Sequence, residues 1–186
     1  MAGAGPRRVV VFCGANPGTS PDFVDAARRV GEGIAIRGWS LVYGGHHAGL
    51  MGACADGCLT QGGHVTGVLP DVLQGREEPP PGIELFRTNG MHERKGLMVS
   101  LADAILALPG GLGTLDELFE QLVWRAIGVH EKPVGMLDVN GYWQPVLEFL
   151  THAQAHGFVR AEARAIPIVD SDVDRLLDRL LGARTA

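Results

Sequence analysis

The sequence predicts a doubly wound, Rossmann-like α/β domain, in which helices cover both faces of a parallel sheet of about seven strands. Two observations support this fold class. Apolar runs alternate with helical patterns along the chain, which is typical of parallel strands joined by crossover helices. Glycine makes up 27 of 186 residues, about twice the usual ~7%, and it gathers directly after apolar runs. Turns that approach a ligand have this composition.

The strands are predicted from short apolar runs. The run at 8–13 is apolar after Arg8 and is typical of a strand buried on both faces. The polar segment 70–82 ends in three prolines, which cannot continue a helix or a central strand, so we predict a surface loop there. The predicted strands are 8–13, 40–43, 64–69, 83–88, 104–108, 132–137 and 165–169.

The helices are predicted from apolar residues that recur every third or fourth position. Ser20 and Pro21 form an N-cap with proline at the first helical position, and Gly38 ends this helix. The predicted helices are 21–37, one carrying Leu50, Cys54 and Leu59, one opening at Met91, one running to about 128, then 142–156 and 171–181.

Composition limits the classes of function. The chain has a net charge of −5 and only two lysines, which argues against binding to a nucleic-acid backbone. It shows no signal peptide and no membrane-spanning run. Cys13, Cys54 and Cys58 are predicted to be reduced core thiols of a cytoplasmic protein. We expect one nucleotide-binding domain over 1–186, with about 1–7 as a flexible tail.

Two glycine turns follow predicted strands. The turn at 109–114 leads from an apolar run into a helix, whose first amides and positive dipole end would bind an anion, most plausibly phosphate. The turn at 44–52 has the same arrangement. Because parallel strands place such turns at one edge of the sheet, the two turns are predicted to share one ligand.

Thr114 and Glu117 allow a purely structural interpretation. Their T-x-x-E spacing is that of a capping box, in which both side chains bond backbone amides at a helix start. On this motif alone, capping and a functional role for Glu117 are about equally supported.

Neither standard dinucleotide nor Walker signatures are present. The first strand-to-helix turn, 14–18, lacks G-x-G-x-x-G, and no P-loop lysine follows the glycines. A mononucleotide or another small phosphate ester remains the simplest ligand.

Three motifs in order resemble the LOG ("Lonely Guy") family, often labelled possible lysine decarboxylases. They are P-G-G-x-G-T-x-x-E at 109–117, M-H-E-R-K at 91–95, and the glycines of 44–52. The resemblance implies cytokinin riboside 5′-monophosphate phosphoribohydrolase activity, in which water cleaves the bond between base and ribose. Glu117 would stabilise the positive charge that develops on the sugar, and by resemblance Arg94 is its catalytic partner.

The remaining site residues follow from the resemblance and the two turns. Lys95 and the amides from Gly110 to Thr114 would hold the phosphate or ribose. No cofactor is implied, and His46 and His47 are not expected to bind metal because no third ligand is apparent. A homodimer with the active site near its interface is implied. The predicted substrate-binding residues are Gly44, Gly45, Gly49, Met91, Lys95, Gly110, Gly111, Leu112, Gly113, Thr114, Leu115 and Asp116.

Two other functions stay open at this point. One is a non-catalytic nucleotide-sensing module, although simple phosphate binding does not need Glu117. The other is a general purine 5′-monophosphate nucleosidase acting on AMP. The chain also differs from many family members, with His46 in place of a glycine, Val123 before the helix tryptophan, and a divergent 70–82 loop.

Overall fold

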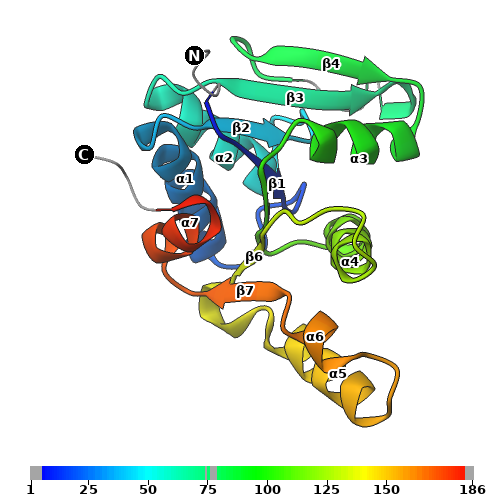
Figure 1. Ribbon diagram of the computed structural model, residues 1–186. Coiled ribbons are helices and arrows are strands. Elements are labelled where there is room, and N and C mark those ends of the chain that lie inside the picture. The colour runs from blue at the N-terminus through cyan, green and yellow to red at the C-terminus, as the bar shows by residue number, and fades with distance from the viewer. Residues whose placement is uncertain (1–5, 74, 76–78, 183–186) are drawn as a thin grey trace, which may run out of the picture.

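The computed structural model describes residues 6–73, 75 and 79–182, and within them it shows a seven-stranded sheet (Figure 1). Every strand pair is parallel, in the order β4-β3-β2-β1-β5-β6-β7. The strands are β1 (Arg8–Phe12), β2 (Ser40–Tyr43), β3 (Val65–Pro70), β4 (Glu84–Thr88), β5 (Ala104–Ala107), β6 (Val134–Leu137) and β7 (Pro167–Asp170). The predicted fold class is therefore confirmed.

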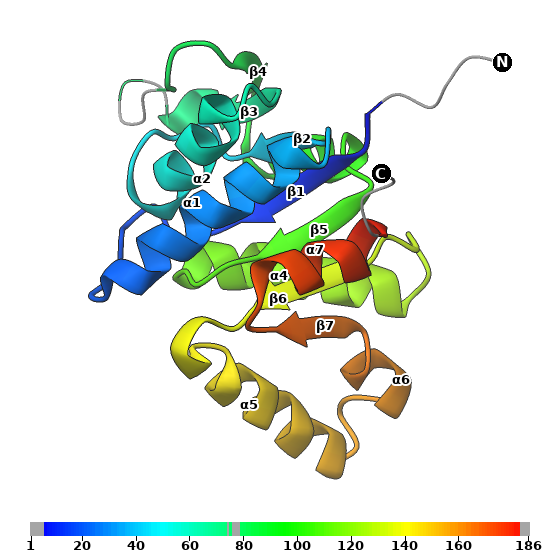
Figure 2. The same ribbon diagram turned by 90° about the vertical axis from the view of Figure 1, so that its left-hand side faces the viewer.

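Helices cover both faces of this sheet. The helices are α1 (Pro21–Ile36), α2 (Gly49–Thr60), α3 (Met91–Ser100), α4 (Leu112–Ala126), α5 (Gln144–Ala155), α6 (Ala161–Arg164) and α7 (Val173–Leu181), with short 3-10 turns η1 (Asp71–Leu73) and η2 (Val139–Gly141). Helices α1, α2 and α7 lie on one face (Figure 2), where they pack with alternate strand residues such as Val9 and Val11. Helices α3, α4 and α5 pack on the other face with Val10 and Phe12.

Most predicted elements lie within one or two residues of their observed positions. Ser20 caps α1 as expected, because its hydroxyl accepts a hydrogen bond from the Asp22 amide at 3.3 Å. Helix α6 was missed because its four residues are too few to show a helical period. The 70–82 loop prediction was wrong at its start, since Pro70 ends β3 and the turn η1 follows.

Parts of two predicted segments lie outside the described residues. These are residues 1–5 of the expected tail and residues 74 and 76–78 of the expected loop. Within the tail, the Arg7 carbonyl accepts a hydrogen bond from the Ser40 amide at 2.9 Å, which joins it to the sheet.

The strand order creates a switch point between β1 and β5. From β1 the chain builds outward through β2, β3 and β4, then returns to pair β5 on the other side of β1. The turns after β1 and β5 diverge at this point, and in open α/β sheets the crevice between such turns is where ligands bind.

Candidate active site

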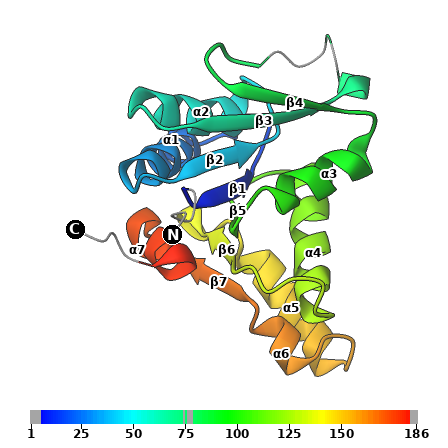
Figure 3. The same ribbon diagram turned by 45° about the horizontal axis from the view of Figure 1, so that its top comes forward.

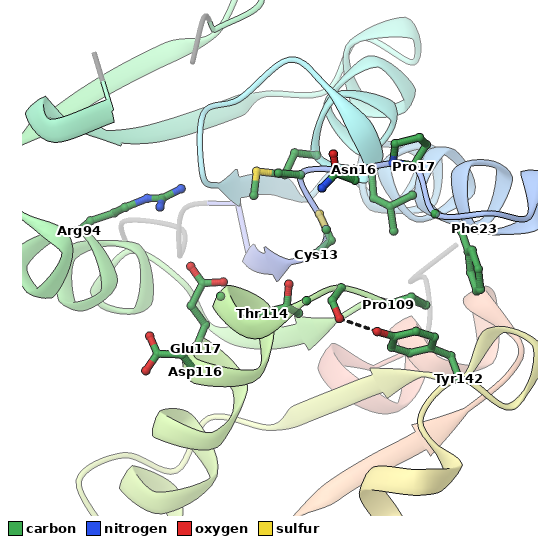
Figure 4. Close-up of a pocket in the computed structure, with 18 of the residues that line it drawn as sticks. Cys13, Asn16, Pro17, Phe23, Arg94, Pro109, Thr114, Asp116, Glu117 and Tyr142 are labelled. Atoms are coloured by element: carbon green, nitrogen blue, oxygen red, sulfur yellow. Dashed lines mark hydrogen bonds between the residues drawn. The ribbon is translucent and has the colours of Figure 1, made fainter. Parts of the chain in front are cut away.

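A cavity of about 390 Å³ lies at this switch point. It is bounded mainly by the turn after β1, the turn after β5, and the first turns of α3 and α4 (Figure 4). Eight of the predicted site residues line it: Met91, Arg94, Gly110, Gly111, Gly113, Thr114, Asp116 and Glu117.

The start of α4 offers unpaired backbone donors to this cavity. Its N-cap is Gly111, and the first intrahelical hydrogen bond runs from the Leu115 amide to the Gly111 carbonyl at 3.0 Å. The amides from Gly111 to Thr114 come before that bond and have no protein acceptor among the described residues. A methyl group added at Gly111 or Gly113 would meet no protein atom within 4 Å. An anion can therefore approach these amides closely.

The capping-box interpretation of Thr114 and Glu117 is wrong. Because α4 begins at Leu112, Thr114 is its third residue and Glu117 its sixth, too far along the helix to reach the cap. Both side chains are buried, with exposed fractions of 3% and 8%. Glu117 is therefore a buried carboxyl group at a cavity, with no capping role.

Arg94 is held by two main-chain carbonyls, one within β3 and one directly after β2. Its Nε donates to the Val68 carbonyl at 3.0 Å, and its Nη2 donates to the Gly44 carbonyl at 2.9 Å. The side chain is 4% exposed, and its guanidinium lies at the same end of the cavity as the Glu117 carboxylate (Figure 4). Gly44 is needed here, because a Cβ at that position would lie 2.2 Å from Nη2.

The electrostatic environment of Glu117 suits proton exchange near neutral pH. Burial raises the pKa of its carboxyl from 4.5 to about 7. Asp116 and Glu120 add to this rise in pKa, while the positive charges of Arg94 and Lys95 oppose it. A carboxyl group with a pKa near the working pH can both stabilise positive charge and exchange a proton with water.

Lys95 has a different environment from its neighbour Arg94. Its ammonium forms ion pairs of 3.0 Å with Asp116 and with Glu120, and it does not line the cavity. Burial acts to lower the pKa of Lys95, but the hydrogen bonds and charges of the two carboxylates outweigh it, so the pKa is raised. Substrate binding by Lys95 stays a prediction, which requires that the substrate displace a carboxylate.

Five further predicted residues lie outside the cavity lining. Leu112 projects into solvent with 87% of its side chain exposed, and Leu115 lies on a shallow groove beside α4. Gly44 supports Arg94, whereas Gly45 packs over Val68 and Leu69. Gly49 lies against the Ala15 carbonyl, 2.3 Å from the position of an added Cβ.

Comparison with known proteins identifies the family. A family model described as "Possible lysine decarboxylase" matches residues 51–180. The cytokinin riboside 5′-monophosphate phosphoribohydrolase LOG of Oryza sativa subsp. japonica is 45% identical over 163 residues, covering 87% of this chain and 67% of that relative. The chain belongs to the LOG family. A relative in Rhodococcoides fascians, also named cytokinin riboside 5′-monophosphate phosphoribohydrolase, is 42% identical over 171 residues, covering 91% of this chain and 86% of the relative.

Solved structures agree with the fold of this LOG-family chain. The molybdenum cofactor carrier protein of Chlamydomonas reinhardtii is 24% identical and has a TM-score of 0.70, covering 95% of this chain and 98% of that one. The molybdenum cofactor binding protein of Rippkaea orientalis is 21% identical with a TM-score of 0.70, covering 96% of each chain. At these identities the comparison concerns the fold alone.

Sequence reasoning missed one whole side of the LOG-family site. The first turn was considered only as a failed dinucleotide fingerprint, although it follows the central strand at the switch point and contains two glycines and a proline. That position in the predicted strand order is the signal that would have found it. The missed lining residues are Cys13, Gly14, Ala15, Asn16, Pro17, Gly18, Phe23, Leu50, Met51, Pro109 and Tyr142.

The positions where the chain departs from many LOG-family members lie away from the cavity lining. His46 is half-buried, and Val123 is 53% exposed on the outer side of α4. His47 pairs with Asp56 at 3.0 Å. The described residues contain no cluster of three His, Cys, Asp or Glu side chains placed to hold a metal ion.

Two further findings concern the cysteines and the apolar character of the helices. Cys13, Cys54 and Cys58 are buried free thiols, as predicted. In the described part of the chain, no helix has the length and apolar character to cross a membrane.

Proposed function

We propose that this protein hydrolyses the N-glycosidic bond of nucleoside 5′-monophosphates of the AMP type, including N6-substituted, cytokinin-like forms. The observation that carries the proposal is one cavity that joins the free amides of α4 to Arg94 and to the buried carboxyl of Glu117. The names of the similar proteins, all phosphoribohydrolases at about 40–45% identity, support it.

We assign each part of such a substrate a position in the cavity. In this assignment the 5′-phosphate binds the amides from Gly111 to Thr114, where the helix dipole favours negative charge. The ribose then lies toward Arg94 and Glu117, at the other end of the cavity from Tyr142 (Figure 4). The base leaves past Met91, which is 42% exposed at the rim.

The reaction needs the carboxylate form of Glu117. As the C1′–N9 bond breaks, positive charge develops on the ribose ring and the carboxylate stabilises it. Water forms the new C1′–O bond as the C1′–N9 bond breaks, and Glu117 accepts one water proton. Glu117 then returns to the carboxylate form as it releases this proton to solvent, from which the departing base takes up one proton. The products are free base and ribose 5-phosphate. Arg94 stays protonated, so it binds substrate oxygens and lowers the pKa of Glu117.

A lysine decarboxylase activity has little support from the lysines themselves. The chain has only Lys95 and Lys132, and a pyridoxal phosphate enzyme needs one of them free to form a Schiff base. Lys95 is paired with two carboxylates, and the Lys132 ammonium donates to the carbonyls of Val99 and Ala102 at the end of α3. Neither lines the cavity.

A nucleotide-sensing module is the second candidate, and Glu117 argues against it. Burying a carboxyl group beside Asp116 and Glu120 raises its pKa and destabilises the charged form. Phosphate recognition by amides does not require this group, whereas glycosidic cleavage does.

The test is incubation of the purified protein with AMP and, separately, with an N6-isopentenyl AMP, with and without a chelator. We expect free base and ribose 5-phosphate in equal amounts by chromatography, with rates that the chelator leaves unchanged. Binding of both nucleotides without release of base would favour the sensing module. Hydrolysis of AMP alone would identify a general purine nucleosidase.

We also propose that the protein is a homodimer through a groove of about 670 Å³ that residues of α4, α5 and α6 line. Figure 3 shows where these three helices lie. The groove exposes large apolar side chains, with Ile127 at 70%, Phe149 at 60% and Phe158 at 87%. Arg160 and Glu162 also line it, so a two-fold axis through the groove brings opposite charges from both copies to one interface. The exposed apolar side chains and the opposite charges favour a second copy of this chain as the occupant.

Light scattering tests the dimer directly, with an expected mass near twice 19.7 kDa. Phe158→Glu places a charge in the groove and should give a monomer. The matched control is Val72→Glu, an apolar position that is 60% exposed and lies outside the groove, which should leave the dimer intact. A wild-type monomer at micromolar concentration would contradict the proposal.

A further inference from the structure

The turns at the carboxyl edge of the sheet are tied together by a series of hydrogen bonds. The Leu50 amide donates to the Gly14 carbonyl at 3.0 Å, and the Gly14 amide donates to the Pro109 carbonyl at 3.0 Å. The Tyr142 hydroxyl then donates to the Gly110 carbonyl at 2.5 Å. Two successive carbonyls of the turn after β5 are therefore held by different segments: the backbone of Gly14 holds that of Pro109, and the side chain of Tyr142 holds that of Gly110.

Tyr142 is itself held firmly at one end of the cavity. Its ring makes an edge-to-face contact with Phe23 at a centroid distance of 5.8 Å (Figure 4). It makes a second edge-to-face contact with Trp143 at 5.2 Å. The preceding turn η2 is joined to the start of α1, because the Asn140 side-chain Nδ2 donates to the Asp22 carboxylate at 2.7 Å. The hydroxyl of Tyr142 therefore reaches Gly110 from a ring that two aromatic contacts orient.

The bond to Gly110 controls the direction of an amide in the anion site. A trans peptide unit is planar, so the Gly111 N–H points opposite to the Gly110 carbonyl. Gly110 and Gly111 have no Cβ to restrict rotation of this peptide unit. A bond that holds the Gly110 carbonyl thus also orients the first free donor of the α4 N-terminus.

We propose that Tyr142 is a positioning residue for recognition of the 5′-phosphate, acting through the Gly110–Gly111 peptide unit. The inference rests on the proposed function, because its kinetic test measures hydrolysis of AMP. It assigns a role to the hydroxyl alone, since the ring packs whether or not the hydroxyl is present. The role concerns ground-state binding at the phosphate end, remote from Glu117 and Arg94 (Figure 4).

Tyr142→Phe removes the hydroxyl and keeps the ring. Loss of one hydrogen bond that orients a donor should raise the KM for AMP roughly five- to tenfold, with kcat within about twofold of wild type. Inhibition by ribose 5-phosphate should weaken by the same factor, whereas inhibition by free adenine should not change. A purely structural role would instead lower the melting temperature and affect both inhibitors alike.

Gln144→Ala is the matched control, because it removes a 2.6 Å hydrogen bond to Asp138 in the same segment, away from the cavity. Its KM for AMP should equal that of the wild type. A Tyr142→Phe protein with unchanged affinity for ribose 5-phosphate, measured by calorimetry, would overturn the inference. Calorimetry needs no turnover, so a wild-type protein that fails to hydrolyse AMP would refute the proposed function and still leave Tyr142 testable.

Discussion

Two glycine turns of similar composition have different roles in this molecule. The α4 turn (residues 110–113) opens onto the cavity, and Gly111 and Gly113 have empty space where a side chain would lie. The α2 turn (residues 44–49) is filled with protein: Gly44 makes room for Arg94, and Gly49 lets the backbone of the first turn approach. The α4 turn contributes donors, whereas the α2 turn supports the groups around them.

The difference shows that a glycine-rich turn after a parallel strand has two uses. Absence of a Cβ permits close approach of any atom, and the sequence motif does not tell whether a ligand or the protein itself approaches. The expectation that both turns share one ligand stays a prediction, because Leu50 and Met51 of the predicted 44–52 turn line the cavity whereas its glycines 44, 45 and 49 do not. Of these glycines, Gly44 reaches the proposed chemistry through Arg94, which its carbonyl holds.

The largest expected effect comes from the two side chains associated with these turns: Glu117, on the helix that the α4 turn opens, and Arg94, an α3 residue whose guanidinium bonds the Gly44 carbonyl of the α2 turn. Glu117→Gln removes the charge that stabilises the oxocarbenium ion, so turnover of AMP should fall roughly 10²-fold or more. Arg94→Ala should cause a similar loss, measured by release of free base.

The double variant should be little worse than either single variant, because residues that act as a unit are not additive. A Glu117→Gln protein with near-normal turnover would leave the proposed mechanism without its main group.

A glycine-to-alanine substitution should change a different kinetic constant in each turn. Gly44→Ala places a methyl group against the Arg94 guanidinium, so kcat should fall about tenfold with little change in KM. Gly111→Ala meets no protein atom but obstructs the ligand, so KM should rise about fivefold with little change in kcat. Steady-state kinetics on AMP would measure both effects.

Gly49→Ala serves as the folding control for this pair. Its φ of +58° is left-handed and its Cβ would collide with the Ala15 carbonyl, so the melting temperature should drop. If Gly44→Ala and Gly111→Ala changed KM and kcat in the same way, the proposed difference in role between the α2 turn and the α4 turn would be wrong.

The smallest expected effect is a dependence of kcat/KM on pH that reports the raised pKa of Glu117. Because its pKa is about 7 in the folded protein, kcat/KM should decline below about pH 7 as the carboxylate becomes protonated. Arg94→Ala removes a charge that lowers this pKa, so the remaining activity should decline from a higher pH.

The raised pKa of Glu117 should also make the stability of the folded protein depend on pH. A carboxyl pKa raised from 4.5 to about 7 means that the folded state holds the proton more tightly, so stability present below pH 4.5 is lost as the pH rises to about 7. Glu117→Gln removes this loss. Its melting temperature should exceed that of the wild type by several degrees at pH 8 and by little at pH 4. If the difference in melting temperature between Glu117→Gln and wild type were the same at pH 4 and pH 8, a raised pKa of Glu117 would be contradicted.

Local patterns in the sequence were sufficient to predict the architecture. Strand runs, the Ser20 cap and the amphipathic helices involve residues close together along the chain, so their periodicity is visible without a structure. The pairing of Arg94 with Glu117 was predicted from the family resemblance, and it agrees with their positions in the first two turns of helices that start at the carboxyl edge of a parallel sheet.

Only the tertiary structure decided which groups face the cavity. Arg94 and Lys95 are adjacent and alike in charge, but neighbouring helix positions point about 100° apart, and the packing of α3 against β3 and α4 sets which of them turns to the site. The bond from Tyr142 to Gly110 spans 32 residues and depends on β6 lying beside β5. Such contacts follow from strand order and helix packing, which a local pattern does not encode.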